Sequence, residues 1–130
     1  MKKHLLIILA LVFTFKSLLL WGAVTEVTLE TKKIKDAVHW IPEIIEVTQG
    51  DQLKIIAKHE LEGGFDFHGL FIPVLKISKQ VNRHKLTKVE VTIPADLKPG
   101  EYPIGCQFHP KHVAAKLIVK AAEKPDPTNK

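Results

Sequence analysis

Short β-branched runs separated by turn-forming residues constrain the fold of this chain more than any other feature. Several of them alternate polar and apolar side chains, which turns one face of an extended strand toward a core and the other toward water. Beyond the first 23 residues, no stretch has the apolar periodicity of an amphipathic helix. The strand-like runs lie at residues 24–31, 43–48, 52–58, 87–93, 102–106 and 113–120.

The segments between these runs predict how the strands are connected. Residues 32–36 suggest a charged connection, and Gly50 and Asp51 predict a hairpin or a corner between sheets, because glycine adopts the positive φ angles of tight turns. An apolar stretch at residues 65–75 contains Pro73, which limits it to a short or edge strand because proline donates no sheet hydrogen bond. We therefore expect an all-β fold, a Greek-key antiparallel β-sandwich of about seven to eight strands.

The first 23 residues differ from the rest of the chain. Lys2 and Lys3 precede an almost unbroken apolar run at residues 5–15, which is the layout of a secretory signal. Lys16 then interrupts the apolar segment, and a lysine at the centre of a membrane span costs about 2.5–3.5 kcal/mol. We expect residues 1–23 to be a signal peptide, or else an N-terminal anchor. The protein is then periplasmic or secreted, or anchored to the inner membrane.

The remaining residues are enough for a single folding unit. Residues 24–120 are predicted to form one domain, followed by a flexible tail at residues 121–130 that contains two prolines. The formal net charge is +5, but without the three leader lysines 16 basic residues oppose 14 acidic ones, a net charge of +2. Arg83 is the only arginine and the lysines form no block, so nucleic acid is not an expected partner.

A thiol and two imidazoles lie close together where the last two strand-like runs meet. They belong to Cys106, His109 and His112, and Cys106 is the single cysteine of the chain. An exported chain with one cysteine forms no internal disulfide, so its thiol is open to oxidation unless something occupies it. Thiolate sulfur and neutral imidazole nitrogen suit copper or zinc. A blue-copper centre needs a second histidine from a distant strand, and His68 is the candidate.

Four signatures follow one another between residues 40 and 119. They are Gly50-Asp51; His68 followed by Ile72-Pro73; Pro99-Gly100-Glu101-Tyr102; and Cys106-Gln107-Phe108-His109-Pro110. In this order and spacing the chain resembles the cupredoxins, and in particular small periplasmic cupredoxin-like domains. The resemblance implies a β-sandwich that holds one copper ion through His68, Cys106 and His109.

One position departs from the family's pattern. Where the family usually has a weak axial methionine, this chain has His112, and its only methionine is Met1. Imidazole is a stronger and harder donor than a thioether, so ligation by His112 would favour Cu(II) and lower the reduction potential. Such a site is similar to the red-copper centre of nitrosocyanin, which also has a cysteine and a second histidine in one loop. An open position for a small molecule is then conceivable.

The resemblance implies an electron carrier rather than an enzyme. Copper would alternate between Cu(I) and Cu(II), with the exposed edge of His109 as the electron port and a redox protein such as a cytochrome as the partner. Periplasmic copper delivery or storage is an alternative, a small catalytic red-copper site is another, and a copper-free descendant of the fold is a third. Contact with a membrane is expected only if the N-terminal segment is retained.

The other histidines and the aromatic residues are expected in structural places. His39, His59 and His84 have no partners at ligand spacing, so each is predicted to lie on the solvated surface. Glu62 and Asp66, shortly before the first predicted ligand, are alternatives as a metal ligand or as a hydrogen-bond partner of an imidazole. The bulky aromatic residues are predicted to lie in the core: Trp40, Phe65, Phe67, Phe71 and Phe108.

Overall fold

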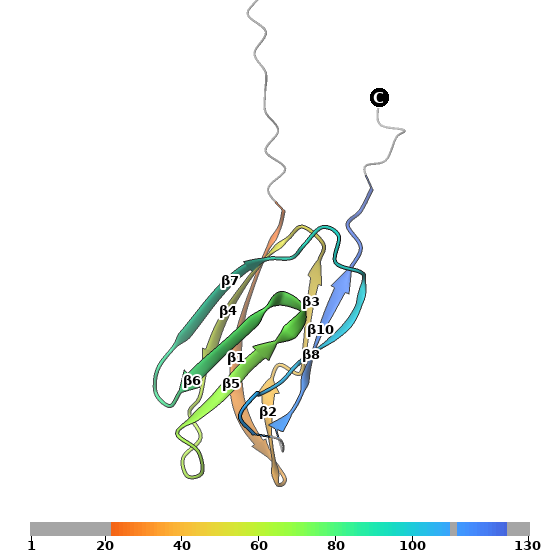
Figure 1. Cartoon of the computed structure of the whole chain (residues 1–130). Coiled ribbons are helices and arrows are strands. Elements are labelled where there is room, and N and C mark those ends of the chain that lie inside the picture. Colours follow the sequence, from red (N-terminus) through yellow and green to blue (C-terminus); the bar gives the residue numbers. More distant parts are fainter. Residues whose placement is uncertain (1–21, 110–111, 125–130) are drawn as a thin grey trace, which may run out of the picture.

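The computed structural model describes residues 22–109 and 112–124, and this part of the chain is almost entirely β-structure (Figure 1). The predicted leader lies outside the described residues except for Gly22 and Ala23, and so does the tail after Lys124. No helix in the described part has the length and apolar character needed to cross a membrane. The elements are β1 (Val24–Ile34), β2 (Ala37–Ile41), β3 (Ile44–Thr48), β4 (Gln52–Lys58), β5 (Phe67–Ile72), the 3-10 turn η1 (Pro73–Leu75), β6 (Ile77–Asn82), β7 (Thr87–Thr92), β8 (Gly100–Ile104), β9 (His112–Val113) and β10 (Ala115–Lys120).

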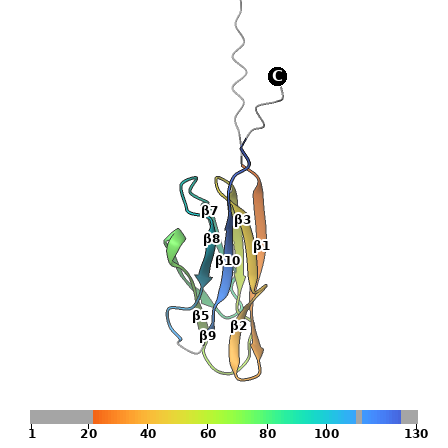
Figure 2. The same cartoon turned by 90° about the vertical axis from the view of Figure 1, so that its right-hand side faces the viewer.

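The strands form two sheets and a smaller pair. The five-stranded sheet has the order β7-β4-β1-β2-β9, and the three-stranded sheet has the order β3-β10-β8. β5 and β6 pair with each other, and Phe71 of β5 forms a bridge with Gly105, just after β8. The turned view in Figure 2 shows a narrow sandwich with β1 on one side and β5 on the other. Both ends of the described chain lie at the end of the sandwich away from β9 (Figures 1 and 2).

The all-β prediction is confirmed, but the sheets are mixed where antiparallel pairing was expected. β1 with β4, β3 with β10, and β2 with β9 pair in parallel. The reason lies in the path of the chain: it leaves the five-stranded sheet after β2, contributes β3 to the other sheet, and returns for β4. Gly50, with a φ of 83°, lies in the link between β3 and β4, so this link is the predicted corner between sheets.

Two strands, β2 and β6, were not predicted. β1 continues through the expected charged connection and forms a hairpin with β2, and Lys32 and Lys33 are tolerated there because their side chains are exposed. β6 pairs with β5, but the alternation along it is broken, since Lys79 is exposed between the buried Ile77 and Val81. β5 ends directly before Pro73, as its lack of a backbone N–H predicts.

Inward-facing side chains of the strands fill one hydrophobic core. Every second side chain of β4 is buried, which is the alternation of a strand with one face on a core. Trp40 is fully buried, as predicted, and Phe67 and Phe71 are half-buried. The core prediction was wrong for Phe65 and Phe108, which are 59% and 43% exposed. Both lie in loops, so no sheet pairing turns them inward.

Candidate metal centre

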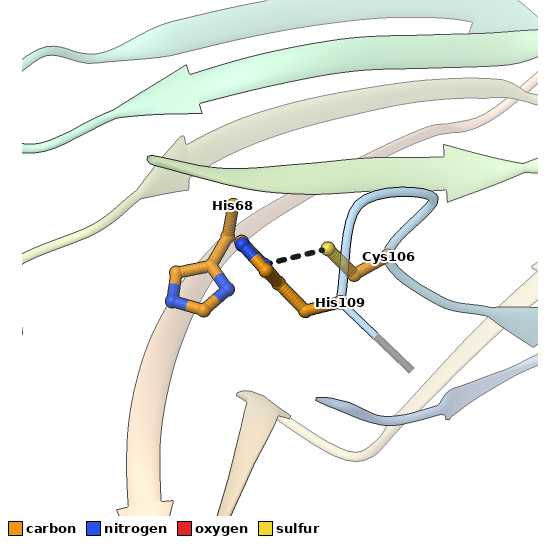
Figure 3. A group of neighbouring side chains, drawn as sticks. All are labelled: His68, Cys106 and His109. Carbon is orange, nitrogen blue, oxygen red and sulfur yellow. Dashed lines mark hydrogen bonds between the residues drawn. The ribbon is translucent and has the colours of Figure 1, made fainter. Parts of the chain in front are cut away.

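Three side chains from two segments converge at one end of the sandwich, and Figure 3 shows them pointing toward one another. His68 is the second residue of β5, whereas Cys106 and His109 lie in the loop after β8. One possible donor atom from each residue lies within 4.8 Å of those of the other two. The structure therefore brings together three of the four predicted ligands.

Backbone groups hold the Cys106 thiol in place. Its Sγ accepts a hydrogen bond of 3.0 Å from the Gly69 backbone N–H and lies 3.5 Å from Nδ1 of His109. The Gly69 carbonyl accepts a hydrogen bond of 3.2 Å from the indole N–H of the buried Trp40. The contact with Gly69 fixes the position of the sulfur beside the His109 ring.

The close approach of the two ligand-bearing segments depends on Gly69. Phe71 of β5 and Gly105 exchange two backbone hydrogen bonds, of 3.0 and 2.8 Å, which join β5 to the loop after β8. A Cβ at Gly69 would meet the side-chain oxygen of Gln107 and would lie only 3.0 Å from the Gln107 backbone nitrogen. The lack of a side chain at position 69 therefore lets this loop lie against the strand that carries His68.

His112 lies beside the cluster but outside the group of mutually close donor atoms. It begins β9, where it pairs with Val38 of β2, so its backbone is attached to the five-stranded sheet. Its ring centroid is 5.1 Å from that of His68 and 5.5 Å from that of Trp40. The structure thus places His112 next to the site, and ligation by it stays a prediction.

Burial favours the neutral form of these imidazoles. It lowers the pKa of His68 to about 3, and the nearby His59, His112 and His109 contribute in the same direction. It also lowers the pKa of His109 and of His112, although the hydrogen bond of His112 to the Val113 carbonyl opposes the shift. Metal binding needs neutral imidazole, because the lone pair on nitrogen is the ligand.

Among the residues that the structure describes, two buried ring nitrogens at the site have no hydrogen-bond partner. They are Nδ1 of His68 and Nε2 of His112. A buried polar atom without a partner destabilises a fold by about 1–3 kcal/mol, so such atoms call for a ligand. The nitrogen of His68 belongs to the cluster with Cys106 and His109, whose sulfur and imidazole donors fit copper, and that of His112 lies beside it.

A cavity of about 470 Å³ opens beside the cluster. This volume is within the range of small-molecule sites, about 300–1,000 Å³. The rings of three histidines face it, so a small molecule inside it would lie next to the predicted ligands. The cavity is lined by His68, His109 and His112, with Lys33, Asp36, Val38, Leu61, Glu62 and Phe65 among the other residues.

Neither of the acidic residues considered as ligands belongs to the cluster formed by the described residues. The Glu62 carboxylate lies 3.2 Å from Nε2 of His84, although its side chain also lines the cavity. The Asp66 carboxylate lies 3.0 Å from the guanidinium of Arg83. Both carboxylates thus pair with neighbouring basic side chains.

The surface prediction was wrong for His59, which is 1% exposed. It directly follows β4 and continues the buried positions Leu53, Ile55 and Ala57 at every second residue. This alternation of buried positions could have been read from the sequence, and it predicts a buried His59 even though His59 has no partner at ligand spacing. His84 is exposed, as predicted.

Aromatic side chains surround the His109 ring. Phe65 stacks on it with a centroid separation of 3.9 Å and an interplanar angle of 26°. Phe67 lies 5.8 Å from the same ring and contacts Phe108 edge to face at 5.1 Å. The two exposed phenylalanines, Phe65 and Phe108, therefore form an apolar border around one predicted ligand.

A family model described as a cupredoxin-like domain matches residues 5–119. The chain belongs to the cupredoxin-like domain family. The family resemblance drawn from the four signatures is thereby confirmed, and the protein has a cupredoxin-like domain with a His/Cys/His candidate metal site. No curated protein sequence matches the chain.

Solved structures with low sequence identity share this cupredoxin-like fold. A copper nitrite reductase from Nitrosomonas europaea is 14% identical with a TM-score of 0.64, over 77% of this chain and 42% of the reductase chain. The metal-binding domain of the Cu(I)-exporting P-type ATPase CopA of Streptococcus pneumoniae D39 is 12% identical with a TM-score of 0.60, over 78% and 90%. A copper-binding protein solved in its apo form is 17% identical with a TM-score of 0.55, over 76% and 90%.

Proposed function

We propose that this cupredoxin-like protein binds one copper ion through His68, Cys106 and His109 and transfers single electrons. Bound there, copper would supply a one-electron couple between Cu(II) and Cu(I). The observation that carries the proposal is the convergence of one thiol and two imidazoles within 4.8 Å. Soft sulfur combined with imidazole nitrogen selects copper or zinc over hard cations, and the cupredoxin-like domain favours copper.

The rigidity of the ligand frame supports electron transfer. His68 lies on a paired strand, and the loop with Cys106 and His109 is joined to that strand by the Phe71–Gly105 hydrogen bonds. Ligands held in this way move little when the charge of the site changes, which lowers the reorganisation that an electron transfer needs. The frame requires no movement of a lid or domain.

The partner we propose is a redox protein such as a cytochrome. The apolar border formed by Phe65 and Phe108 around His109 supports this partner, because exposed apolar groups mark sites of protein contact. The basic and apolar leader supports export to the periplasm or beyond, with anchoring to the inner membrane if the leader is retained.

We include His112 as a fourth ligand. Its Nε2 is buried and has no hydrogen-bond partner in the described part of the chain, and its ring lies 5.1 Å from the ring of His68. An imidazole at this position in place of a thioether would stabilise Cu(II) and lower the reduction potential, as in a red-copper centre similar to that of nitrosocyanin.

Copper loading of the purified protein tests the proposal. One equivalent of Cu(II) should give an intense thiolate-to-copper absorption band that disappears on reduction and returns on oxidation. Cys106→Ser should abolish the band, whereas His84→Gln, which alters an exposed histidine outside the cluster, should keep it. Failure of the wild-type protein to bind stoichiometric copper would overturn the metal assignment. Copper retained by Cys106→Ser without the band would favour delivery or storage.

A catalytic copper site is a second candidate, and the cavity beside His68, His109 and His112 favours it. A small substrate could reach the metal through this cavity. Azide, a small anion that binds open Cu(II) positions, separates the two functions. A saturable change in the Cu(II) absorption and electron paramagnetic resonance (EPR) spectra on azide addition would favour catalysis, and unchanged spectra would favour an electron carrier.

A further inference from the structure

The buried His59 ring has a hydrogen-bond partner at each nitrogen. Its Nδ1 lies 2.9 Å from the Thr31 hydroxyl, and its Nε2 lies 2.8 Å from the Phe65 carbonyl oxygen. A carbonyl only accepts, so Nε2 carries a hydrogen, and in the neutral ring Nδ1 accepts from the Thr31 hydroxyl. Thr31 is itself only 1% exposed. These two bonds fix both the tautomer and the orientation of the His59 ring.

The same ring contacts a predicted copper ligand directly. The centroids of His59 and His68 are 4.6 Å apart, and the rings meet edge to face at 85°. Nδ1 of His68 has no hydrogen-bond partner among residues 22–109 and 112–124. The orientation of the His68 ring therefore depends on what packs against it, and His59 is one of those neighbours.

His59 also reaches the second imidazole through Phe65. The Phe65 carbonyl accepts the His59 N–H, and the Phe65 ring stacks on His109 at 3.9 Å. Phe65 follows Gly63 and Gly64, whose φ angles of 73° and 81° are readily adopted by glycine. Because glycines restrict the backbone little, the hydrogen bond from His59 to the Phe65 carbonyl helps to fix this segment.

We propose that His59 is a positioning residue that holds the rings of both His68 and His109 in the geometry of the metal centre without binding the metal. The inference rests on the proposed copper site. Both nitrogens of His59 are engaged, and His59 is not part of the donor cluster of the described residues, so it acts through its neighbours. Partners that orient metal ligands in this way commonly change metal affinity about 10- to 100-fold when removed.

Arg83 provides the matched comparison. Its guanidinium also donates to the Phe65 carbonyl, at 3.1 Å. No aromatic contact joins Arg83 to His68, in contrast to His59. An Arg83→Gln variant should therefore disturb Phe65 and His109 while leaving His68 in place.

Two substitutions separate the two roles of His59. His59→Phe keeps a ring against His68 but removes the hydrogen bond to the Phe65 carbonyl. His59→Gln keeps an N–H donor near the position of Nε2 but removes the ring. Thr31→Val retains His59 and removes only the hydroxyl that holds its Nδ1, so it serves as a milder variant if either of the others fails to fold.

Nuclear magnetic resonance (NMR) spectra of the metal-free protein give a readout that needs no copper. After subtraction of the ring current that residue 59 itself exerts on His68, His59→Phe should reduce the shift that Phe65 produces on His109 and keep the His68 resonances in place, and His59→Gln should do the reverse. In the Cu(II) form, both variants should alter the EPR hyperfine pattern and raise the copper dissociation constant about 10- to 100-fold.

The proposal is overturned if both His59 variants lose stability to urea, show no change in the His68 and His109 shifts beyond the altered ring current of residue 59, and keep the wild-type EPR spectrum. His59 would then be only a core residue. If the NMR shifts separate as expected but the wild-type protein binds no copper, the copper proposal fails and the positioning of the two rings by His59 stands.

Discussion

Replacing Gly69 by alanine should disturb the copper centre far more than it disturbs the fold. The φ angle of Gly69 is outside the left-handed region, so the backbone accepts alanine. Alanine reduces the conformational entropy of the unfolded chain, which stabilises the folded protein by about 0.4–1 kcal/mol. The new Cβ would lie 2.6 Å from the amide carbon of Gln107, so this side chain must turn away and lose its 3.2 Å hydrogen bond to Ser78, which contributes about 0.5–1 kcal/mol. The two effects nearly cancel, and we expect a change in unfolding free energy within about 1 kcal/mol.

The metal centre should respond because Gly69 also donates to the Cys106 sulfur. The Cβ would lie 3.0 Å from the backbone nitrogen of Gln107, so the loop must shift by a few tenths of an ångström and lengthen the N–H to sulfur hydrogen bond. This bond favours reduced copper, where the thiolate carries more charge. Losing about 1 kcal/mol of that preference lowers the reduction potential by about 40 mV.

A double-mutant cycle checks this reasoning. Gln107→Ala alone removes the hydrogen bond to Ser78, and the Gly69→Ala/Gln107→Ala pair removes the contact between the new Cβ and the amide. Urea unfolding and redox titration would be measured on all four proteins. Gly69→Ala should change the stability little in the wild type and raise it in the Gln107→Ala background. An equal change in both backgrounds, or an unchanged potential, would refute the close-contact explanation.

Three further predictions concern the site. The pKa of His68 is about 3 in the folded protein against an ordinary value of 6.5, so on acidification the unfolded chain is protonated at His68 before the folded protein is. The unfolding free energy is therefore unaffected by His68 above about pH 7 and falls by about 2 kcal/mol by pH 5, which urea unfolding of the apo protein would measure. His68→Gln should lack this part of the pH dependence, and an identical pH profile in the variant would contradict the prediction. His112→Met should raise the reduction potential in a redox titration, because a thioether is the weaker ligand for Cu(II), and an unchanged potential would mean that His112 does not ligate. Trp40→Phe removes the N–H that the Gly69 carbonyl accepts and should lower the unfolding free energy by about 1–3 kcal/mol, whereas a value below about 0.5 kcal/mol would show that this bond contributes little.

The candidate site was predictable from the sequence because its residues follow a spacing set by geometry. Cys106 and His109 lie in one loop, so their proximity is encoded locally, and the order of the family signatures connected them to His68 across 37 residues. The position of His112 was less accessible to sequence reasoning. Its distance from the other donors depends on the pairing of β9 with β2, a strand that the sequence pattern did not reveal.

The environment of the ligands was harder to predict than the ligands themselves. His59 was placed on the surface because it lacked ligand spacing, although it continues the inward parity of β4. Phe65 was assigned to the core from its hydrophobicity, but it lies in a loop and stacks on His109. Both errors have the same cause: a residue's neighbours across the two sheets are set by tertiary packing, which composition and local alternation do not specify.

The two ends of the described chain leave the sandwich beside the same corner. The Ala23 carbonyl accepts from the Gln52 N–H, and the Ala122 N–H donates to the Gln49 side chain, whereas β9 and the ligand loop lie at the far end (Figure 2). β1 runs between these two ends, and its 11 residues cover about 36 Å at about 3.3 Å per residue. A tether or fused domain at either terminus would therefore lie about one strand length from the proposed copper ligands. The end of the sandwich that carries His68, Cys106 and His109 would stay accessible to a partner protein.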